Sequence, residues 1–204
     1  MPSIDRLFAT KLYRAALGGR GAKRLNADLA QACKDIARED RAGRKWSKEH
    51  GYRGYTSYAS LADLPRRSPA FAELVTHLDR HVAKFAKALD FDLNGRRLKL
   101  DSIWLNVMHS GAVHTAHIHP KSIISGTYYV AIPSGAGALK LEDPRLGLMM
   151  AAPPRKARAA RDNQTFVYLE PQTGSLFLWE SWLRHEVPLN RARGERISIS
   201  FNYA

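Results

Sequence analysis

Apolar residues recur at helical spacing in two stretches of the first half of the chain. The first stretch runs from Lys23 to Arg44, and the second covers roughly residues 68 to 90. Apolar side chains at steps of three and four residues line one face of a helix. The pattern therefore predicts two amphipathic helices. Between them lies a Gly-, Tyr- and Ser-rich segment, Trp46 to Leu64, that shows no clean period and is expected to be irregular.

After Asn94-Gly95 the pattern changes to short apolar runs that are rich in β-branched and aromatic residues. The candidate strands are Lys99–Val107, Ala116–Ile118, Ser125–Ile132, Ala138–Leu141, Thr165–Leu169, Ser175–Trp179, His185–Pro188 and Ile197–Asn202. Short strands at near-regular spacing are typical of sandwiches, jelly rolls and barrels. A Pro-, Ala- and Arg-rich segment at 149–163 interrupts the series and is expected to be a mobile loop. The sequence predicts an α+β chain.

Composition is that of an ordinary globular protein. A chain of 204 residues with 45% hydrophobic residues forms one domain without help from disulfides, and the single cysteine, Cys33, excludes a disulfide framework. No apolar run approaches the roughly 20 residues that a membrane helix requires, and the first residues lack a signal-peptide core. We expect a cytoplasmic protein with no membrane partner, in which Cys33 is a buried, inert thiol.

The chain is strongly basic. It carries 32 Lys and Arg residues against 19 Asp and Glu residues, for a net charge of +13. Such a charge suits an anionic partner such as RNA. The basic residues are scattered, however, and no RNA-binding signature is present. A solvated basic surface is therefore favoured over a nucleic-acid site.

Histidines are concentrated in the β-rich half, which holds five of the eight, and the densest group is HTAHIHP. Alternate residues of a strand point to the same face, so His117 and His119 would project together. A transition metal needs at least a third ligand, and His185 in WLRHEVPLN is the natural candidate. The alternative is a pair of hydrogen-bonded polar residues near a sheet edge. We favour the metal site.

A late strand carries a candidate anion site. Arg196 and Ser198 share the face opposite to Ile197 and Ile199, which suit the core. On an interior face, Arg196 could hold a carboxylate through a charge-assisted, bidentate pair of hydrogen bonds. The alternative is an ordinary exposed arginine on an antiparallel strand. The nearby histidines favour the anion site.

Several segments taken together resemble a known family. They are Gly111, the HxHP motif from His117 to Pro120, Ser125–Val130, the EDPR motif from Glu142 to Arg145, Pro171 with Gly174, WLRHEVPLN and GERISISFN. The pattern is similar to iron(II)/2-oxoglutarate-dependent oxygenases of the prolyl-hydroxylase-like group. The resemblance implies a double-stranded β-helix (jelly roll) core over 96–204. The helices of residues 1–95 would pack on its sheet, and the whole of 1–204 would form a single domain.

The resemblance also implies roles for individual residues. His117 matches the first iron ligand of the family and His185 the distal one. Arg196 matches the basic residue that clamps the distal carboxylate of 2-oxoglutarate. The expected cosubstrate-binding residues are Arg196, Ser198, Tyr129 and Asn106. The reaction implied is hydroxylation of a substrate that is not identified, with O2 as the other cosubstrate.

One position departs from the larger superfamily, because His119 stands where the aspartate of HxD is usual. We expect Fe(II) to be bound by His117, His119 and His185. Glu142 or Asp143 as a carboxylate ligand is a less favoured alternative.

Two other functions remain open. One is a cupin-like dioxygenase that uses the three histidines without 2-oxoglutarate. The other is a basic module that binds nucleic acid or an acidic protein and carries an idle metal site. The substrate could be an acidic macromolecule, and a homodimer is also open.

Overall fold

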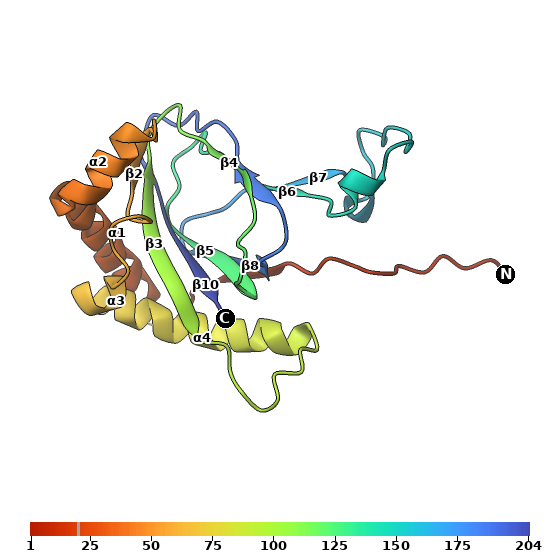
Figure 1. Cartoon of the computed structure of the whole chain (residues 1–204), viewed down its shortest axis with the longest axis horizontal. Coiled ribbons are helices and arrows are strands. Elements are labelled where there is room, and N and C mark those ends of the chain that lie inside the picture. The colour runs from red at the N-terminus through yellow and green to blue at the C-terminus, as the bar shows by residue number, and fades with distance from the viewer. Residues whose placement is uncertain (20) are drawn as a thin grey trace.

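The protein is built from a helical layer and two antiparallel sheets (Figure 1). The computed structural model describes residues 1–19 and 21–204. The helices cover one face of a six-stranded sheet, and a four-stranded sheet lies on its other side. This is the α+β, jelly-roll architecture that the sequence predicts.

The helical layer contains four helices in the described residues. They are α1 (Ala22–Glu39), α2 (Arg41–Glu49), α3 (Leu64–Arg67) and α4 (Pro69–Ala88), and two short 3-10 turns, η1 (Leu146–Leu148) and η2 (Arg161–Asn163), lie between later strands. Helix α4 confirms the helix expected over 68–90, and Pro69 stands in its first turn, where no amide partner is lost. Cys33 is buried in α1, and burial raises the pKa of its thiol to about 12, so it is inert as predicted.

The single helix predicted over Lys23–Arg44 is wrong, because the chain breaks at Asp40. Its ψ of 89° is not helical, and its carboxylate accepts hydrogen bonds from the Gly43 amide (3.0 Å), the Tyr55 hydroxyl (2.8 Å) and the Ser60 hydroxyl (2.5 Å). Burial raises the pKa of Asp40, but these donors outweigh burial and hold it below its usual value. Asp40 thus ends α1, caps α2 and ties both to the following loop. The segment expected to be irregular accordingly begins inside α2.

Replacing Asp40 with alanine is expected to lower the free energy of unfolding by about 2 kcal/mol at neutral pH. The change removes a helix cap and leaves two hydroxyls without their acceptor. Urea unfolding of both proteins measures the difference. Because the folded-state pKa of Asp40 is lowered, the difference is fully present above its usual pKa of 3.8 and should shrink as pH falls through the folded value. A difference independent of pH down to acid unfolding would contradict the role of the charge.

The two sheets contain ten strands in the described chain. In spatial order the larger sheet is β1 (Tyr13–Ala16), β8 (Ser175–Glu180), β5 (Ile124–Ala131), β10 (Arg196–Tyr203), β3 (Leu100–Met108) and β2 (Gly54–Thr56). The smaller sheet is β4 (His114–His117), β9 (His185–Val187), β6 (Leu139–Glu142) and β7 (Phe166–Leu169). Each of the eight predicted runs overlaps an observed strand, and the ends differ by two residues at most.

Two strands come from the part of the chain that was expected to be helical. β1 pairs with β8 at one edge of the larger sheet, and β2 pairs with β3 at the other. Both are short, and pairing with a neighbour determines them more than their own pattern does. The N-terminal part is therefore not only a helical cover but also completes the sheet on both sides.

Apolar and polar residues alternate along β10, so one face of the strand packs against the helices and the other faces the smaller sheet. Ile197, Ile199 and Phe201 lie in the apolar core that the larger sheet shares with α1 and α4. The intervening residues, Arg196, Ser198, Ser200 and Asn202, make polar contacts on the other face, toward the smaller sheet. Burial of apolar side chains on the helix side stabilises the fold by about 1.5–3 kcal/mol for each large residue. The face toward the smaller sheet is thus free to carry polar groups.

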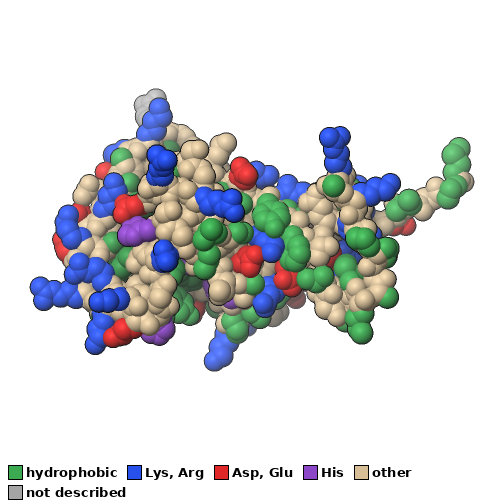
Figure 2. Space-filling view, turned by 90° about the horizontal axis from the view of Figure 1, so that it is seen from above, with side chains coloured by type: hydrophobic (Ala, Val, Ile, Leu, Met, Phe, Trp, Pro, Cys, Tyr) green, Lys and Arg blue, Asp and Glu red, His purple; other side chains and the backbone are tan. Residues whose placement is uncertain are grey.

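The positively charged side chains are spread over the surface and are not clustered. On the face shown in Figure 2, Lys and Arg side chains are spread among other side chains and do not form one continuous patch. Within the described ranges, no helix combines the length and the apolar character needed to cross a membrane.

Candidate metal centre

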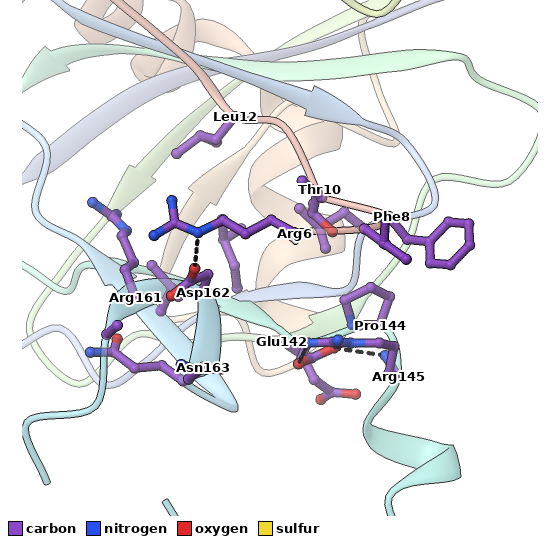
Figure 3. Close-up of a pocket in the computed structure, with 18 of the residues that line it drawn as sticks. Arg6, Phe8, Thr10, Leu12, Glu142, Pro144, Arg145, Arg161, Asp162 and Asn163 are labelled. Atoms are coloured by element: carbon purple, nitrogen blue, oxygen red, sulfur yellow. Dashed lines mark hydrogen bonds and ion pairs between the residues drawn. The ribbon is translucent and has the colours of Figure 1, made fainter. Parts of the chain in front are cut away.

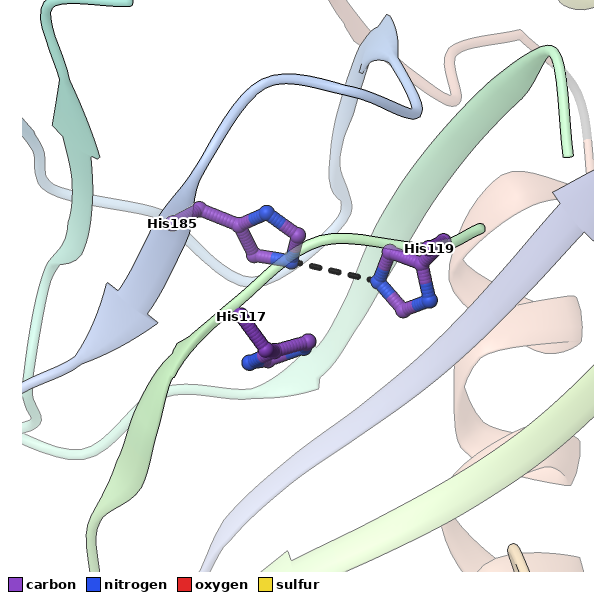
Figure 4. Close-up of side chains that lie close together, drawn as sticks. All are labelled: His117, His119 and His185. Atoms are coloured by element: carbon purple, nitrogen blue, oxygen red, sulfur yellow. Dashed lines mark hydrogen bonds between the residues drawn. The ribbon is translucent and has the colours of Figure 1, made fainter. Parts of the chain in front are cut away.

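Three histidines converge between the two sheets, as the sequence predicts (Figure 4). His117 ends β4 and stands directly opposite His185 of β9, while His119 follows two residues later. One nitrogen from each ring lies within 4.8 Å of the others, and the Nε2 atoms of His119 and His185 are 3.2 Å apart. This is the spacing of three ligands around one ion.

The reason for the convergence differs in part from the expected one. Of the pair His117 and His119, only His117 lies in a strand, so strand alternation does not place His119. Instead, the His119 amide donates to the Ser181 carbonyl (3.0 Å), which ties the turn after β4 to the turn after β8. The pair is therefore assembled by a strand end and a tethered turn.

Backbone carbonyls orient two of the rings. Nδ1 of His117 donates to the Thr115 carbonyl (2.6 Å), and Nδ1 of His185 donates to the Leu183 carbonyl (2.8 Å). A proton held on Nδ1 leaves the Nε2 lone pair free for a metal. Both rings are thus prepared as Nε2 ligands before any ion binds.

The electrostatic environment keeps His119 and His185 neutral. Burial, and then the neighbouring His117, lower the pKa of His185 to about 3 and that of His119 to about 4. Neutral imidazole is the form that binds metals. Among the described residues, no carboxylate joins the cluster.

The two acidic residues considered as a ligand lie elsewhere. Glu142 pairs with Arg184 at 3.5 Å, and Asp143 pairs with Arg145 at 2.8 Å. Neither belongs to the group of ligand atoms that surrounds the three histidines. The centre is therefore an all-histidine site in the described structure.

Arg196 is buried on the face of β10 that lies opposite Ile197 and Ile199. Only 1% of it is exposed; its Nε donates to the Gly137 carbonyl (3.3 Å), and its Nη1 donates to the Ser198 hydroxyl (3.2 Å) and lies 3.5 Å from the Met108 sulfur. Burial lowers the pKa of Arg196. In the described part of the chain no carboxylate pairs with it. A buried charge without a counter-charge is costly, so this geometry calls for an anionic ligand.

Tyr129 lies beside Arg196. Its ring centroid lies 5.2 Å from the guanidinium carbon of Arg196, and its buried hydroxyl has no hydrogen-bond partner among the described residues. Asn106, by contrast, is occupied: it accepts from Thr56 (2.8 Å) and donates to Ser200 (3.3 Å). It lies in the interior as expected, but as part of a satisfied network.

Aromatic rings flank the histidines. Trp104 lies 5.8 Å from His119 and 5.3 Å from Tyr58, and Trp179 meets His185 edge-on at 4.7 Å, all between ring centroids. Tyr58 is 64% exposed, so it stands at the outer end of this wall. Tyr58 was not expected in the site, because its segment shows no regular pattern.

Tyr52 and His114 are further interior residues that sequence reasoning missed. On a regular strand, His114 and His117 would point to opposite faces, since three residues separate them. In the pairing of β4 with β9, a register irregularity lies between His114 and His117, so the regular alternation of side chains between the two faces does not hold there. The only available signal was the histidine density of HTAHIHP.

A groove on the surface lies away from the three histidines (Figure 3). It holds about 820 Å³ and is lined by the N-terminal arm from Ile4 to Leu12, the β6 end and the segment 160–164. The Arg6–Asp162 ion pair (3.0 Å) crosses it, with both side chains largely exposed. Neither the three histidines nor Arg196 lines this groove.

The comparisons with known proteins agree with the site. Residues 102–202 match the family model described as "Putative 2OG-Fe(II) oxygenase". A prolyl-4-hydroxylase from Pseudomonas putida is 18% identical over 97% of this chain and 94% of its own, with a TM-score of 0.63. HygX from Streptomyces hygroscopicus, with nickel and 2-oxoglutarate bound, is 18% identical over 96% and 83%, with a TM-score of 0.60.

Two further findings complete the comparison. The chain spans 52% of the length of a 2OG-Fe(II) oxygenase from Burkholderia pseudomallei, at 16% identity and a TM-score of 0.46. No curated protein matches the sequence.

The jelly roll, the three-histidine cluster and the family match together define a non-haem iron, 2-oxoglutarate-dependent oxygenase. Residues 102–202, about half of the chain, match the model of a family of 2OG-Fe(II) oxygenases. Fe(II) is the cofactor of this family and 2-oxoglutarate its cosubstrate. The residues present fit both, because three converging imidazoles suit Fe(II) and the buried Arg196 suits a dicarboxylate.

Proposed function

We propose that this protein is a hydroxylase that uses Fe(II), 2-oxoglutarate and O2. In this proposal the iron is held by His117, His119 and His185, and the distal carboxylate of 2-oxoglutarate is bound by Arg196, Ser198 and Tyr129. The observation that carries the proposal is Arg196, a fully buried cation that faces the histidine cluster's own interior space and has no anionic partner in the described structure.

The bound iron supplies the oxidation of a substrate C–H bond to an alcohol, while 2-oxoglutarate and O2 are converted to succinate and CO2. The chain's own residues bind, orient and exclude water. Arg196 fixes the cosubstrate by a charge-assisted bidentate contact, so that its 2-oxo acid end reaches the histidines. Trp104 and Trp179 shield the centre from solvent.

Charge balance supports this assignment. Three neutral histidines leave the full +2 charge on iron, and Arg196 adds another positive charge. The two carboxylates of 2-oxoglutarate offset most of this charge in a space without acidic side chains of its own. An HxD site would leave less positive charge for the cosubstrate to offset.

The substrate is proposed only as a class. The net charge of +13 favours an acidic macromolecule that is drawn to the protein by its spread positive field. A homodimer remains a prediction, to be tested by light scattering.

An anaerobic titration of the Fe(II)-loaded protein with 2-oxoglutarate tests the function. Chelation of the iron by the 2-oxo acid gives a weak visible absorption band, and we expect that band to appear and to saturate. If iron binds without the band, the centre works as a cupin-like dioxygenase without 2-oxoglutarate. If no metal binds and the protein instead binds nucleic acid with a steep salt dependence, it is a binding module.

A further inference from the structure

Tyr52 and His114 form a hydrogen-bonded pair of partly buried side chains. The Tyr52 hydroxyl and the His114 Nε2 are 2.6 Å apart, and the ring centroids are separated by 5.2 Å. Tyr52 precedes β2, whereas His114 begins β4, so the contact joins the N-terminal part of the chain to the smaller sheet. Neither residue has a role in the proposed function so far.

Packing places this pair beside Arg196. Tyr52 packs against a small apolar cluster of Met108, Ala112 and Val187, and the Met108 sulfur is a contact of the Arg196 guanidinium. His114 stands opposite Val187 in the pairing of β4 with β9. The pair therefore borders the Arg196 space from the side of the smaller sheet.

The same strands also lead to the metal centre. β4 runs from His114 to His117, and β9 runs from His185 to Val187, so both begin or end at the histidine cluster and reach the Arg196 region at their other end. A molecule that extends from the three histidines to Arg196 must pass along these strands.

The Tyr52–His114 pair has one polar hydrogen that its mutual hydrogen bond does not use. Burial lowers the pKa of His114 to about 3 and raises that of Tyr52, so both groups are neutral at pH 7 and carry one titratable hydrogen each. Their mutual bond uses one of the two. Whichever group donates, the other keeps an N–H or O–H for which the described structure shows no acceptor.

We propose that the Tyr52–His114 pair donates this remaining hydrogen to the distal carboxylate of 2-oxoglutarate. Arg196 and Tyr129 then hold the carboxylate from the larger sheet, and the pair holds it from the smaller sheet. The assignment rests on the proposed function. It makes Tyr52 and His114 cosubstrate-binding residues that lie outside the jelly-roll strand carrying Arg196.

The test is calorimetric titration of the Fe(II)-loaded protein without oxygen, using two probes. 2-Oxoglutarate reaches both the metal and Arg196, whereas oxalate chelates the metal but is too short to reach Arg196. The double variant Tyr52→Phe/His114→Phe removes both hydrogens. It keeps two planar rings, and replacing both partners by apolar groups of similar shape costs little stability. Thermal unfolding checks that it folds, and Tyr168→Phe, at a tyrosine that is 57% exposed, is the matched control.

The expected result is that the double variant binds 2-oxoglutarate at least about tenfold more weakly, while its oxalate affinity is unchanged. Each single variant keeps one hydrogen and should fall between the parent and the double variant. These single variants carry the same test if the double variant is unstable. The control should bind both probes like the parent.

Two results would overturn the assignment alone: 2-oxoglutarate binding within about twofold of the parent, or equal weakening of both probes. These results count against the Tyr52–His114 assignment alone only if an Arg196→Met variant no longer binds 2-oxoglutarate, because that loss shows that the cosubstrate site itself is correctly placed. If the parent binds iron and oxalate but not 2-oxoglutarate, the proposed function itself is overturned, and the assignment falls with it.

Discussion

Replacing Arg196 with methionine is expected to weaken 2-oxoglutarate binding by about 100-fold or more and, at the same time, to stabilise the protein. The guanidinium is 1% exposed and has no carboxylate partner in the described chain, so the protein carries the desolvation cost of a charge that only a ligand offsets. Methionine fills a similar volume without that cost. We expect the free energy of unfolding to rise by about 1–4 kcal/mol.

The two halves of this prediction are measured separately. Urea unfolding of the metal-free proteins gives the stability change, and anaerobic titration with 2-oxoglutarate gives the affinity change. The loss of affinity follows because removing one side of a buried, charged hydrogen-bonded pair costs about 2–5 kcal/mol. Arg184→Met is the matched control, since Arg184 is half exposed and pairs with Glu142 at the surface. It should leave both quantities nearly unchanged.

The contrary outcomes have different meanings. An Arg196→Met protein that turns over substrate with an unchanged 2-oxoglutarate requirement would remove Arg196 from the cosubstrate site. A variant that is less stable than the parent would show that the contacts with Gly137 and Ser198 outweigh the cost of burying the charge.

Replacing His185 with alanine is expected to lower metal affinity by at least about 100-fold and to abolish turnover. Loss of an outer partner of a metal ligand alone costs 10–100-fold, and this change removes a ligand atom itself. His185 is buried between His117, His119 and Trp179, so no nearby side chain can replace it. Titration with Fe(II) under argon, or with Ni(II) in air, measures the loss.

His50→Ala is the control for this experiment, because His50 is exposed at the C-terminal end of α2, where it stacks on Trp46 and hydrogen-bonds the Trp46 carbonyl. It should bind metal like the parent. Parental metal affinity in the His185 variant would place the ion elsewhere and would leave the three-histidine cluster with a structural role.

The sequence predicted the β-rich part well because its alternation is strong. β10 shows why: Ile197, Ile199 and Phe201 suit a core and the residues between them do not, so register and facing follow directly. The break at Asp40 had no such signal. No Gly or Pro stands at residue 40, and two of the hydrogen bonds that hold Asp40 come from Tyr55 of β2 and from Ser60 in the loop that follows.

The site residues were likewise predicted only where histidines or charged residues stand in recognisable sequence motifs. His117, His119, His185 and Arg196 stand in motifs; the structure brings the three histidines together and buries Arg196. Tyr52 and Tyr58 lie in a segment without period, and only the tertiary fold places them near the histidines or Arg196. The local pattern of apolar and polar residues cannot predict contacts between residues that are far apart in the sequence.

The alternation of β10 has a consequence for how such a protein can change over generations. Odd-numbered residues of the strand hold the helices to the sheet, whereas even-numbered residues face the reaction space. Heritable substitutions at Ser198, Ser200 or Asn202 can therefore alter what the centre accepts without loosening the apolar packing behind it. Selection can act on the chemistry and on the stability of this fold almost independently, residue by residue along a single strand.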